Sequence, residues 1–168
     1  MAYQQTIVRN AEESDVPLIL ECIRGLAEYE HLLDQVTASE AGLRQTIFRD
    51  HKAEVLIAEY QETPQEVKQA AGFVLFFHNY STFTGKPGIY IEDLFVKSEF
   101  RGKGIGKALL SRVAGIAAER NCGRLEWSCL DWNNPSIAFY KSQGAQPLTG
   151  WTVYRVTGEA LGALADRG

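Results

Sequence analysis

Three glycines, spaced two residues apart, lie where a predicted strand gives way to a predicted helix. They are Gly102, Gly104 and Gly106, and residues 97–107 around them hold four basic side chains against Glu99, a net charge of +3. Glycines let a backbone approach a phosphate closely, and the N–H groups of a helix N-terminus attract negative charge. The segment therefore predicts an anion site, with a glycine turn bearing surface lysines as the alternative.

Two familiar phosphate-binding patterns do not fit this loop. The Walker A pattern needs a first glycine and a Ser or Thr after its lysine, where the chain has Arg101 and Ala108. The dinucleotide pattern G-x-G-x-x-G meets Lys107 where its last glycine belongs. The pattern that does fit is Arg-x-x-Gly-x-Gly, formed by Arg101, Gly104 and Gly106.

Glu92 interrupts an otherwise apolar, β-rich run at residues 89–96. A carboxylate among apolar neighbours is partly desolvated, which raises its pKa toward that of a useful general base. Period-two alternation predicts Glu92 and Leu94 on one face of the strand and Asp93 on the other, and we interpret Asp93 as structural. The competing interpretation of Glu92 is an acid paired with a nearby cation.

The net charge of −4 is unevenly distributed along the 168 residues. Residues 10–40 hold eight acidic side chains and one arginine, a net charge of −7. Such a stretch either forms a solvated face or attracts a cationic ligand by long-range electrostatics. A mildly acidic chain with a pI near 5.4 also argues against a nucleic-acid binder, which would have a basic surplus.

Strand and helix patterns alternate along the chain, which indicates an α/β protein. Strands are predicted at residues 6–9, 54–60, 71–80, 89–96, 125–130 and 151–156. Helices are predicted from Ser14, over 39–48 and 107–120, from Asn134 to a stop at Gly144, and as a turn at 161–165. Ser14, Ser39 and Asn134 are the predicted N-caps. Because the chain shows no repeat, low-complexity tract or change in composition, residues 1–168 are expected to form a single domain.

The remaining residue types that could do chemistry show no ligand spacing. Cys22, Cys122 and Cys129 lack a C-x-x-C pattern and the three histidines are scattered, so neither disulfides nor a metal site are expected. Residues 1–5 lack a charged start followed by an apolar run, and no stretch approaches 18 apolar residues. We therefore expect no leader, no membrane span and a cytoplasmic protein.

The Arg-x-x-Gly-x-Gly loop resembles the coenzyme A pyrophosphate loop of the GNAT superfamily of N-acetyltransferases. Segments 26–30 (LAEYE), 91–96 (IEDLFV) and 131–145 (DWNNPSIAFYKSQGA) are similar to the diamine (spermidine/spermine) and thialysine acetyltransferase branch. The resemblance extends from Val8 to about Ala165. It implies a GNAT fold, which is α/β with a central mixed, mostly antiparallel sheet of about seven strands flanked by helices.

The resemblance implies acetyl-CoA as co-substrate and no metal. The pyrophosphate would lie on the loop, and the pantetheine arm would insert as a pseudo-strand where residues 94–96 splay from the next strand. The implied cofactor-binding residues are Leu94, Phe95, Val96, Arg101, Gly102, Lys103, Gly104, Ile105, Gly106, Lys107, Asn133, Pro135 and Ser136. Taken alone, Asn133 is typical of a turn.

The resemblance also implies which residues act on the amine. Glu92 would accept its proton through ordered water, and Tyr140 would protonate the leaving thiolate, although a helical tyrosine alone is more typical of a core. Tyr29 and Glu30 would line the amine channel together with Glu92. Taken alone, Glu30 is equally consistent with an exposed acid at a helix end.

Two departures from the relatives that acetylate polyamines bear on the substrate. Ser81 and Phe83 stand where those enzymes have Asp and Trp, and residues 147–150 (PLTG) lack the acids that precede Trp151 there. A long polycation needs anionic partners at more than one amine. The loss of two carboxylates therefore favours a shorter amine, such as a diamine or a lysine-like amino acid.

Together these features predict an acetyl-CoA-dependent N-acetyltransferase, an acyltransferase of EC 2.3.1 type. Its expected acceptor is a primary amine of a small molecule (diamine, polyamine or lysine-like amino acid), attacking directly in a ternary complex. The alternatives are a non-catalytic coenzyme A-binding or sensing module, against which Glu92 and Tyr140 argue, and a protein or peptide N-acetyltransferase. Because the family is usually homodimeric, a homodimer is expected.

Overall fold

The computed structural model describes residues 5–167, in two compact units divided between Cys129 and Leu130. The first unit contains β1 (Gln5–Asn10), α1 (Val16–Tyr29), α2 (Glu40–Leu43), β2 (Glu54–Gln61), β3 (Gln69–Ser81), β4 (Lys86–Val96), α3 (Ile105–Glu119) and β5 (Leu125–Trp127). The second contains α4 (Asn134–Ser142) and α5 (Gly158–Ala165). Residues 1–4, on which the expectation of no leader partly rests, lie outside the described residues. Among the helices of residues 5–167, none combines the length and apolar character needed to cross a membrane.

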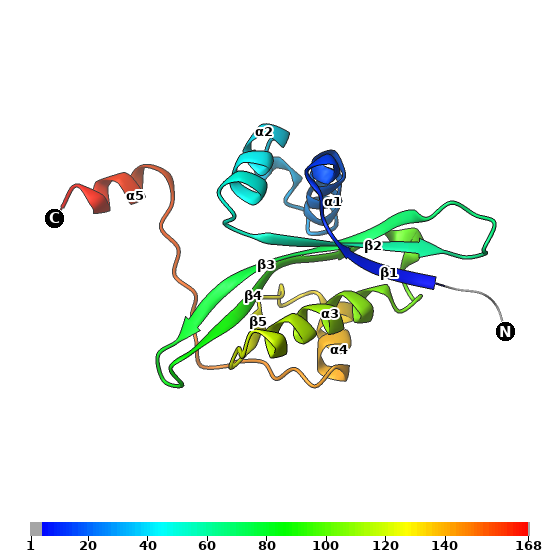
Figure 1. The fold of residues 1–168 in the computed structure, drawn as a ribbon. Coiled ribbons are helices and arrows are strands. Elements are labelled where there is room, and N and C mark those ends of the chain that lie inside the picture. The colour runs from blue at the N-terminus through cyan, green and yellow to red at the C-terminus, as the bar shows by residue number, and fades with distance from the viewer. Residues whose placement is uncertain (1–4, 168) are drawn as a thin grey trace. The chain divides into compact units, whose positions relative to one another are not determined.

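The strands of the first unit form one sheet in the order β1-β2-β3-β4-β5 (Figure 1). The first four pair antiparallel and β5 pairs parallel to β4. This confirms the mixed, mostly antiparallel α/β sheet, but the expected number of about seven strands is wrong, since the described residues form five. The strand expected at residues 151–156 is not formed, because within residues 5–167 this segment pairs with no other strand. Apolar alternation describes the side chains, whereas a ladder also requires a neighbouring backbone.

Helices cover both faces of this sheet: α1 and α2 lie on one side and α3 on the other (Figure 1). On the α1 face, Ile19 and Cys22 pack with Phe73 and Phe95 in a buried apolar cluster. Because side chains alternate along a strand, the neighbours of Phe73 in β3 face α3 instead. These two cores fix the positions of β4 and of the helices that flank it.

Of the three predicted N-caps, Ser39 is confirmed and the other two are wrong. Ser39 Oγ accepts a hydrogen bond at 3.2 Å from an N–H in the first turn of α2. Ser14 lies within a 3₁₀ turn that precedes α1. The cap of α4 is Asn133 rather than Asn134, because Asn133 Oδ1 accepts from the N–H of Ser136 at 3.3 Å. The earlier asparagine is the one that reaches a free donor of the first turn.

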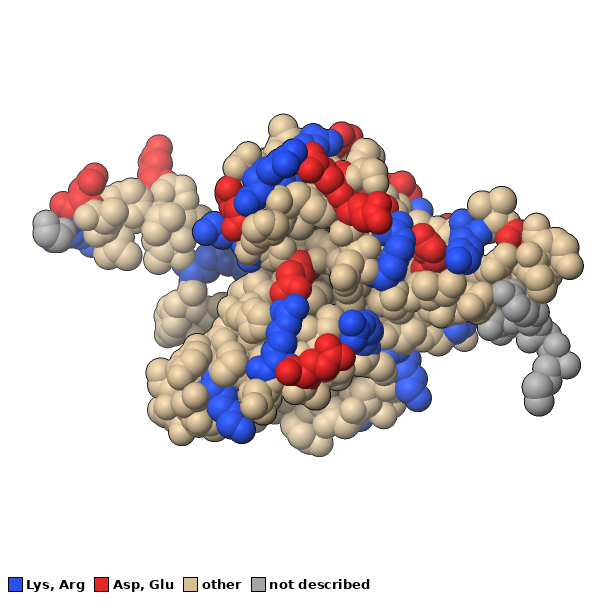
Figure 2. Space-filling model, viewed as in Figure 1, with Lys and Arg blue, Asp and Glu red and all other residues tan. Residues whose placement is uncertain are grey.

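The acidic stretch at residues 10–40 is partly neutralised by cations from other segments. Acidic and basic side chains are interspersed over the surface in view (Figure 2). The ion pairs join Asp15 to Arg9 (2.6 Å), Glu13 to Arg44 (3.3 Å) and Arg49 (2.9 Å), and Glu21 to Lys97 (2.7 Å). The net charge of −7 is therefore not a uniform attractive field.

Candidate active site

The glycine loop ends in a helix N-terminus that no side chain caps. Gly104 is the N-cap of α3, with a left-handed φ of +80°, and Gly102 has a φ of +77°. The first hydrogen bond of the helix runs from the N–H of Ala108 to the C=O of Gly104 at 3.0 Å. The N–H groups of residues 105–107 come before it and need another acceptor. The structure thus has the glycine turn and open helix N-terminus that the sequence predicted, and anion binding there stays a prediction.

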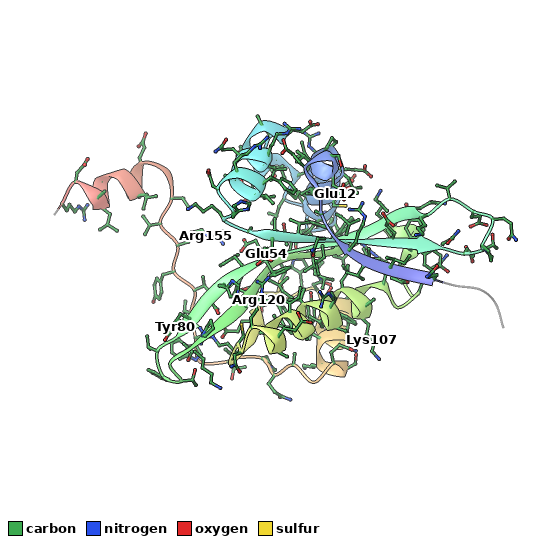
Figure 3. All side chains as sticks on the ribbon, in the orientation of Figure 1. Glu12, Glu54, Tyr80, Lys107, Arg120 and Arg155 are labelled. Atoms are coloured by element: carbon green, nitrogen blue, oxygen red, sulfur yellow. The ribbon has the colours of Figure 1, made fainter. Side chains whose placement is uncertain are left out.

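The opposite end of α3 is anchored to the sheet. Arg120, which directly follows the helix, donates two hydrogen bonds to Glu54 at the start of β2, at 2.5 and 2.7 Å (Figure 3). Ile105, Leu109 and Val113 are buried along the same helix. With one end and one face fixed, α3 holds its uncapped N-terminus in a defined position.

The two cations inside the loop contact protein groups. Arg101 Nε donates to the C=O of Val96 at 3.0 Å, and the guanidinium lies 4.7 Å from the ring centroid of Tyr29. The ammonium of Lys103 pairs with Glu62, just beyond β2, at 3.3 Å. Arg101 therefore extends toward the end of α1, and Lys103 toward β2.

β4 contains a β-bulge at Glu92. In the pairing with β3, Ile91 lies opposite Phe76 and Asp93 lies opposite Leu75, so Glu92 is an extra residue without a partner in the register. Opposite residues of a ladder point to the same face. The bulge thus leaves Ile91 on the α3 face and directs Asp93 to the α1 face. A strict alternation of side chains between the two faces of β4 does not allow for this extra residue.

Asp93 and Glu30 form an acidic pair on the α1 face. Glu30 is the C-cap of α1, and the bulge directs Asp93 toward the same side. Burial, followed by the negative charges of Glu92 and Glu30, raises the pKa of Asp93 to about 6. Burial also raises the pKa of Glu30. Because a nearby positive charge would stabilise both ionised forms, the acidic pair favours a cationic ligand.

Glu92 itself is exposed, so the prediction that its apolar neighbours desolvate it is wrong. Asp93 occupies the desolvated position instead, because the bulge moves it onto the covered face. Asp93 is therefore a candidate site residue that sequence reasoning missed, and its sequence signal was its place beside Glu92 in an apolar run. The assignment of Glu92 as base stays a prediction.

β4 and β5 separate beyond Ile91. Their ladder joins three pairs of residues and ends with Ile91 opposite Trp127, whereas β4 continues to Val96. Within the described part of the chain, residues 92–96 therefore have no strand partner on the β5 side. Backbone groups along such an edge can pair with an extended ligand. Leu94, Phe95 and Val96 lie along this unpaired edge, where the resemblance implies a splay.

The second unit brings the remaining predicted residues together on one helix. Asn133, Pro135 and Ser136 form the start of α4, and Asn133 is engaged as its N-cap. Tyr140 lies further along α4, with its ring centroid 5.2 Å from that of Phe139. The first unit thus holds the glycine loop, the unpaired edge of β4 and the acidic pair, and the second unit holds the candidate acid Tyr140.

The glycine loop beyond β4, the unpaired edge of that strand and the carboxylates on it fit the acyl-transferring α/β enzyme that the resemblance implies. The sequence profile of the Acetyltransferase (GNAT) family matches residues 20–145. The chain therefore belongs to the GNAT acetyltransferase family and is an N-acetyltransferase.

Three similar proteins place the chain within that family. Thialysine N-epsilon-acetyltransferase of Bos taurus is 41% identical over 167 residues, which cover 96% of this chain and 98% of the relative. L-ornithine N5-acetyltransferase of Arabidopsis thaliana is 34% identical over 197 residues, covering 94% of this chain and 86% of the relative. The solved structure of an integron cassette protein from the mobile metagenome of V. cholerae has a TM-score of 0.76 and 29% identity, covering 95% of this chain and 97% of that one. The resemblance to the thialysine branch is confirmed.

Proposed function

We propose that this chain transfers an acetyl group from acetyl-CoA to a primary amine of a small molecule, such as a diamine, a polyamine or a lysine-like amino acid. The observation that carries the proposal is that one strand, β4, adjoins two sites that suit ligands of opposite charge. The acidic pair, Asp93 with Glu30, suits a cationic amine, and the uncapped glycine loop beyond β4 suits phosphates. The similarity to thialysine and L-ornithine acetyltransferases supports a short acceptor with a side-chain amine.

The glycine loop fits the phosphates of coenzyme A. Its leading N–H groups lack a side-chain cap, and a Cβ built on Gly102 or Gly104 would meet no atom within 4 Å, so the backbone is open to a ligand. We assign phosphate binding to residues 101–107 and pantetheine binding to the edge of β4 at 94–96. Asn133, Pro135 and Ser136 complete the proposed set from the second unit.

Gly104→Ala is expected to weaken coenzyme A binding about tenfold. A left-handed φ costs a residue with a Cβ about 1–2 kcal/mol, and the loop would relax away from the conformation that presents its N–H groups. Titration calorimetry with coenzyme A measures the change. Gly115→Ala is the matched control in the middle of the same helix, where the nearest atom to a new Cβ is 3.8 Å away. It should raise Tm without changing the affinity, and equal affinities for both variants would contradict the loop assignment.

The acidic pair prepares the amine for attack. An alkylammonium ion bound between Asp93 and Glu30 loses a proton to Asp93, whose raised pKa of about 6 makes it a stronger base than an ordinary aspartate. The adjacent Glu92, which is exposed, passes that proton to water. Glu92 therefore stays in the proposed catalytic set, and Asp93 joins it.

Acetyl transfer then follows by direct attack of the neutral amine in a ternary complex. The nitrogen forms a bond to the thioester carbonyl carbon as the bond from that carbon to sulfur breaks. Backbone N–H groups on the free edge of β4 stabilise the carbonyl oxygen, as in an oxyanion hole. The thiolate that leaves takes a proton from the hydroxyl of Tyr140. The nitrogen releases its second proton as the amide forms, this proton restores the hydroxyl of Tyr140, and the products are the acetylated amine and coenzyme A.

The test of this function is a screen of acceptors that follows consumption of acetyl-CoA. The panel contains thialysine, L-ornithine, L-lysine, short diamines, spermidine, spermine and lysine-containing peptides. We expect the highest kcat/KM for an amino acid with a side-chain amine or for a short diamine. Preference for peptides would contradict the small-molecule acceptor, and the absence of any acceptor would contradict the function as a whole.

We also propose that the protein is a cytoplasmic homodimer. Cys22 and Cys122 are free thiols, as suits a reducing compartment. In the second unit Trp151, Val153 and Tyr154 are each at least 79% exposed, and such apolar stretches commonly mark contacts between proteins. Multi-angle light scattering should give twice the chain mass of 18.7 kDa. A mass of one chain at micromolar concentration would contradict the dimer.

A further inference from the structure

Arg101 joins parts of the site that are far apart in the sequence. Its backbone belongs to the glycine loop, but its guanidinium lies over the ring of Tyr29, the last residue of α1, with 4.7 Å between Cζ and the ring centroid. Its Nε donates to the C=O of Val96, where β4 ends, at 3.0 Å. A single side chain therefore links the loop, the end of β4 and the helix that Glu30 caps.

These contacts leave part of the guanidinium available to an anion. The guanidinium carbon lies over the ring of Tyr29 and 5.8 Å from the ring centroid of Phe95, and Nε–H is used by Val96. An arginine has four further N–H donors on its two terminal nitrogens, directed along the plane of the group. An anion on the loop can accept from these donors while the guanidinium stays over the ring of Tyr29. A lysine, with one compact charge, cannot stack, donate to a carbonyl and bind an anion in this way.

We propose that Arg101 is a positioning residue that couples occupation of the glycine loop to the amine site. An anion on the loop fixes the guanidinium plane, the plane fixes the ring of Tyr29, and the ring fixes Glu30 at the end of α1. The amine then binds more tightly when the loop is occupied. By thermodynamic linkage, the coenzyme binds more tightly by the same factor when the amine is present. This inference rests on the proposed function and adds to it the contact that connects the two substrates.

Titration calorimetry of the amine, with and without saturating coenzyme A, measures the coupling. The amine is the best acceptor from the screen above, and no reaction occurs because coenzyme A has no acetyl group. In the wild-type protein we expect the Kd of the amine to fall about 2- to 30-fold when coenzyme A is present, the range expected for a cation–π contact. A ratio of about 1 in the wild type would overturn the proposal.

Variants of the two stacked residues test the contact itself. Arg101→Lys and Tyr29→Leu should each reduce the ratio of Kd values to about 1. Tyr29→Phe is the matched control, because it keeps the ring and should keep the ratio. A ratio that persists in Tyr29→Leu, or is lost equally in Tyr29→Phe, would overturn the proposal even if Arg101→Lys does not fold. The acceptor screen tests the proposed function separately from the coupling. If the wild type acetylates no amine in that screen, the proposed function has failed before any ratio of Kd values is measured.

Discussion

Removal of one hydroxyl group, in Tyr140→Phe, is expected to lower kcat about 100-fold or more. The variant keeps the ring and its contact with Phe139, so α4 should keep its structure. The lost proton donor would leave the thiolate without its general acid in the step that breaks the carbon–sulfur bond. The Kd for coenzyme A should change little, because binding does not require that proton. Steady-state kinetics with the best acceptor and calorimetry with coenzyme A separate the two effects.

Tyr80→Phe is the matched control for this change. Tyr80 lies on β3 with an exposed side chain, and the loss of its hydroxyl should leave kcat unchanged (Figure 3). Wild-type turnover in Tyr140→Phe would show that the thiolate leaves without help from this residue. Equal losses in the two variants would point to a general effect of hydroxyl removal rather than to acid catalysis.

The second large effect is expected from Asp93→Asn. In the wild type, kcat/KM should rise with pH through about 6, since Asp93 must be ionised to hold the ammonium and accept its proton. The amide can do neither, so we expect the variant to lose about 100-fold in kcat/KM and to lose this rise. Glu92→Gln provides the comparison. Because the charge of Glu92 contributes to the raised pKa of Asp93, its removal should shift the rise to lower pH. Loss of the rise in Glu92→Gln alone would make Glu92 the base.

Asp93→Asn should at the same time stabilise the fold at neutral pH. The pKa of Asp93 is raised in the folded protein to about 6, above the value of about 3.9 expected in the unfolded chain. The carboxylate is therefore an unfavourable charge in the folded state above about pH 6, and this cost disappears below about pH 4, where both states are protonated. We expect a gain of about 2–3 kcal/mol in the free energy of unfolding at pH 7 and none at about pH 3.5. Urea denaturation at both pH values measures it, and a loss of stability at pH 7 would contradict the buried acid.

Local features of the site could be predicted from the sequence because each depends on a few adjacent residues. The spacing of Arg101, Gly104 and Gly106 specified a strand, a glycine turn and a helix N-terminus, and the structure has all three in that order. Ser39 as an N-cap follows the same local logic. The α/β class and the mixed sheet followed from alternating patterns and from the resemblance.

Features that depend on a second segment could not be predicted in this way. The bulge at Glu92 is a property of the register between β3 and β4, and no pattern within β4 alone reveals it. That register, together with the end of α1, gives Asp93 rather than Glu92 the desolvated position. The contact of Arg101 with Tyr29 joins residues 72 positions apart in the chain. The strand expected at 151–156 fails for the same reason, since pairing belongs to two backbones.

The bulge in β4 has a consequence for how this enzyme can vary over evolution. Glu92 has no opposite residue in β3 and is exposed, so neither core depends on the shape of its side chain. Most positions next to a reactive centre are constrained by packing, and a change in reactivity there also changes stability. An inserted residue is free of that constraint while remaining beside Asp93. Natural variation at this single position can therefore adjust the proton chemistry of the site while the fold stays the same.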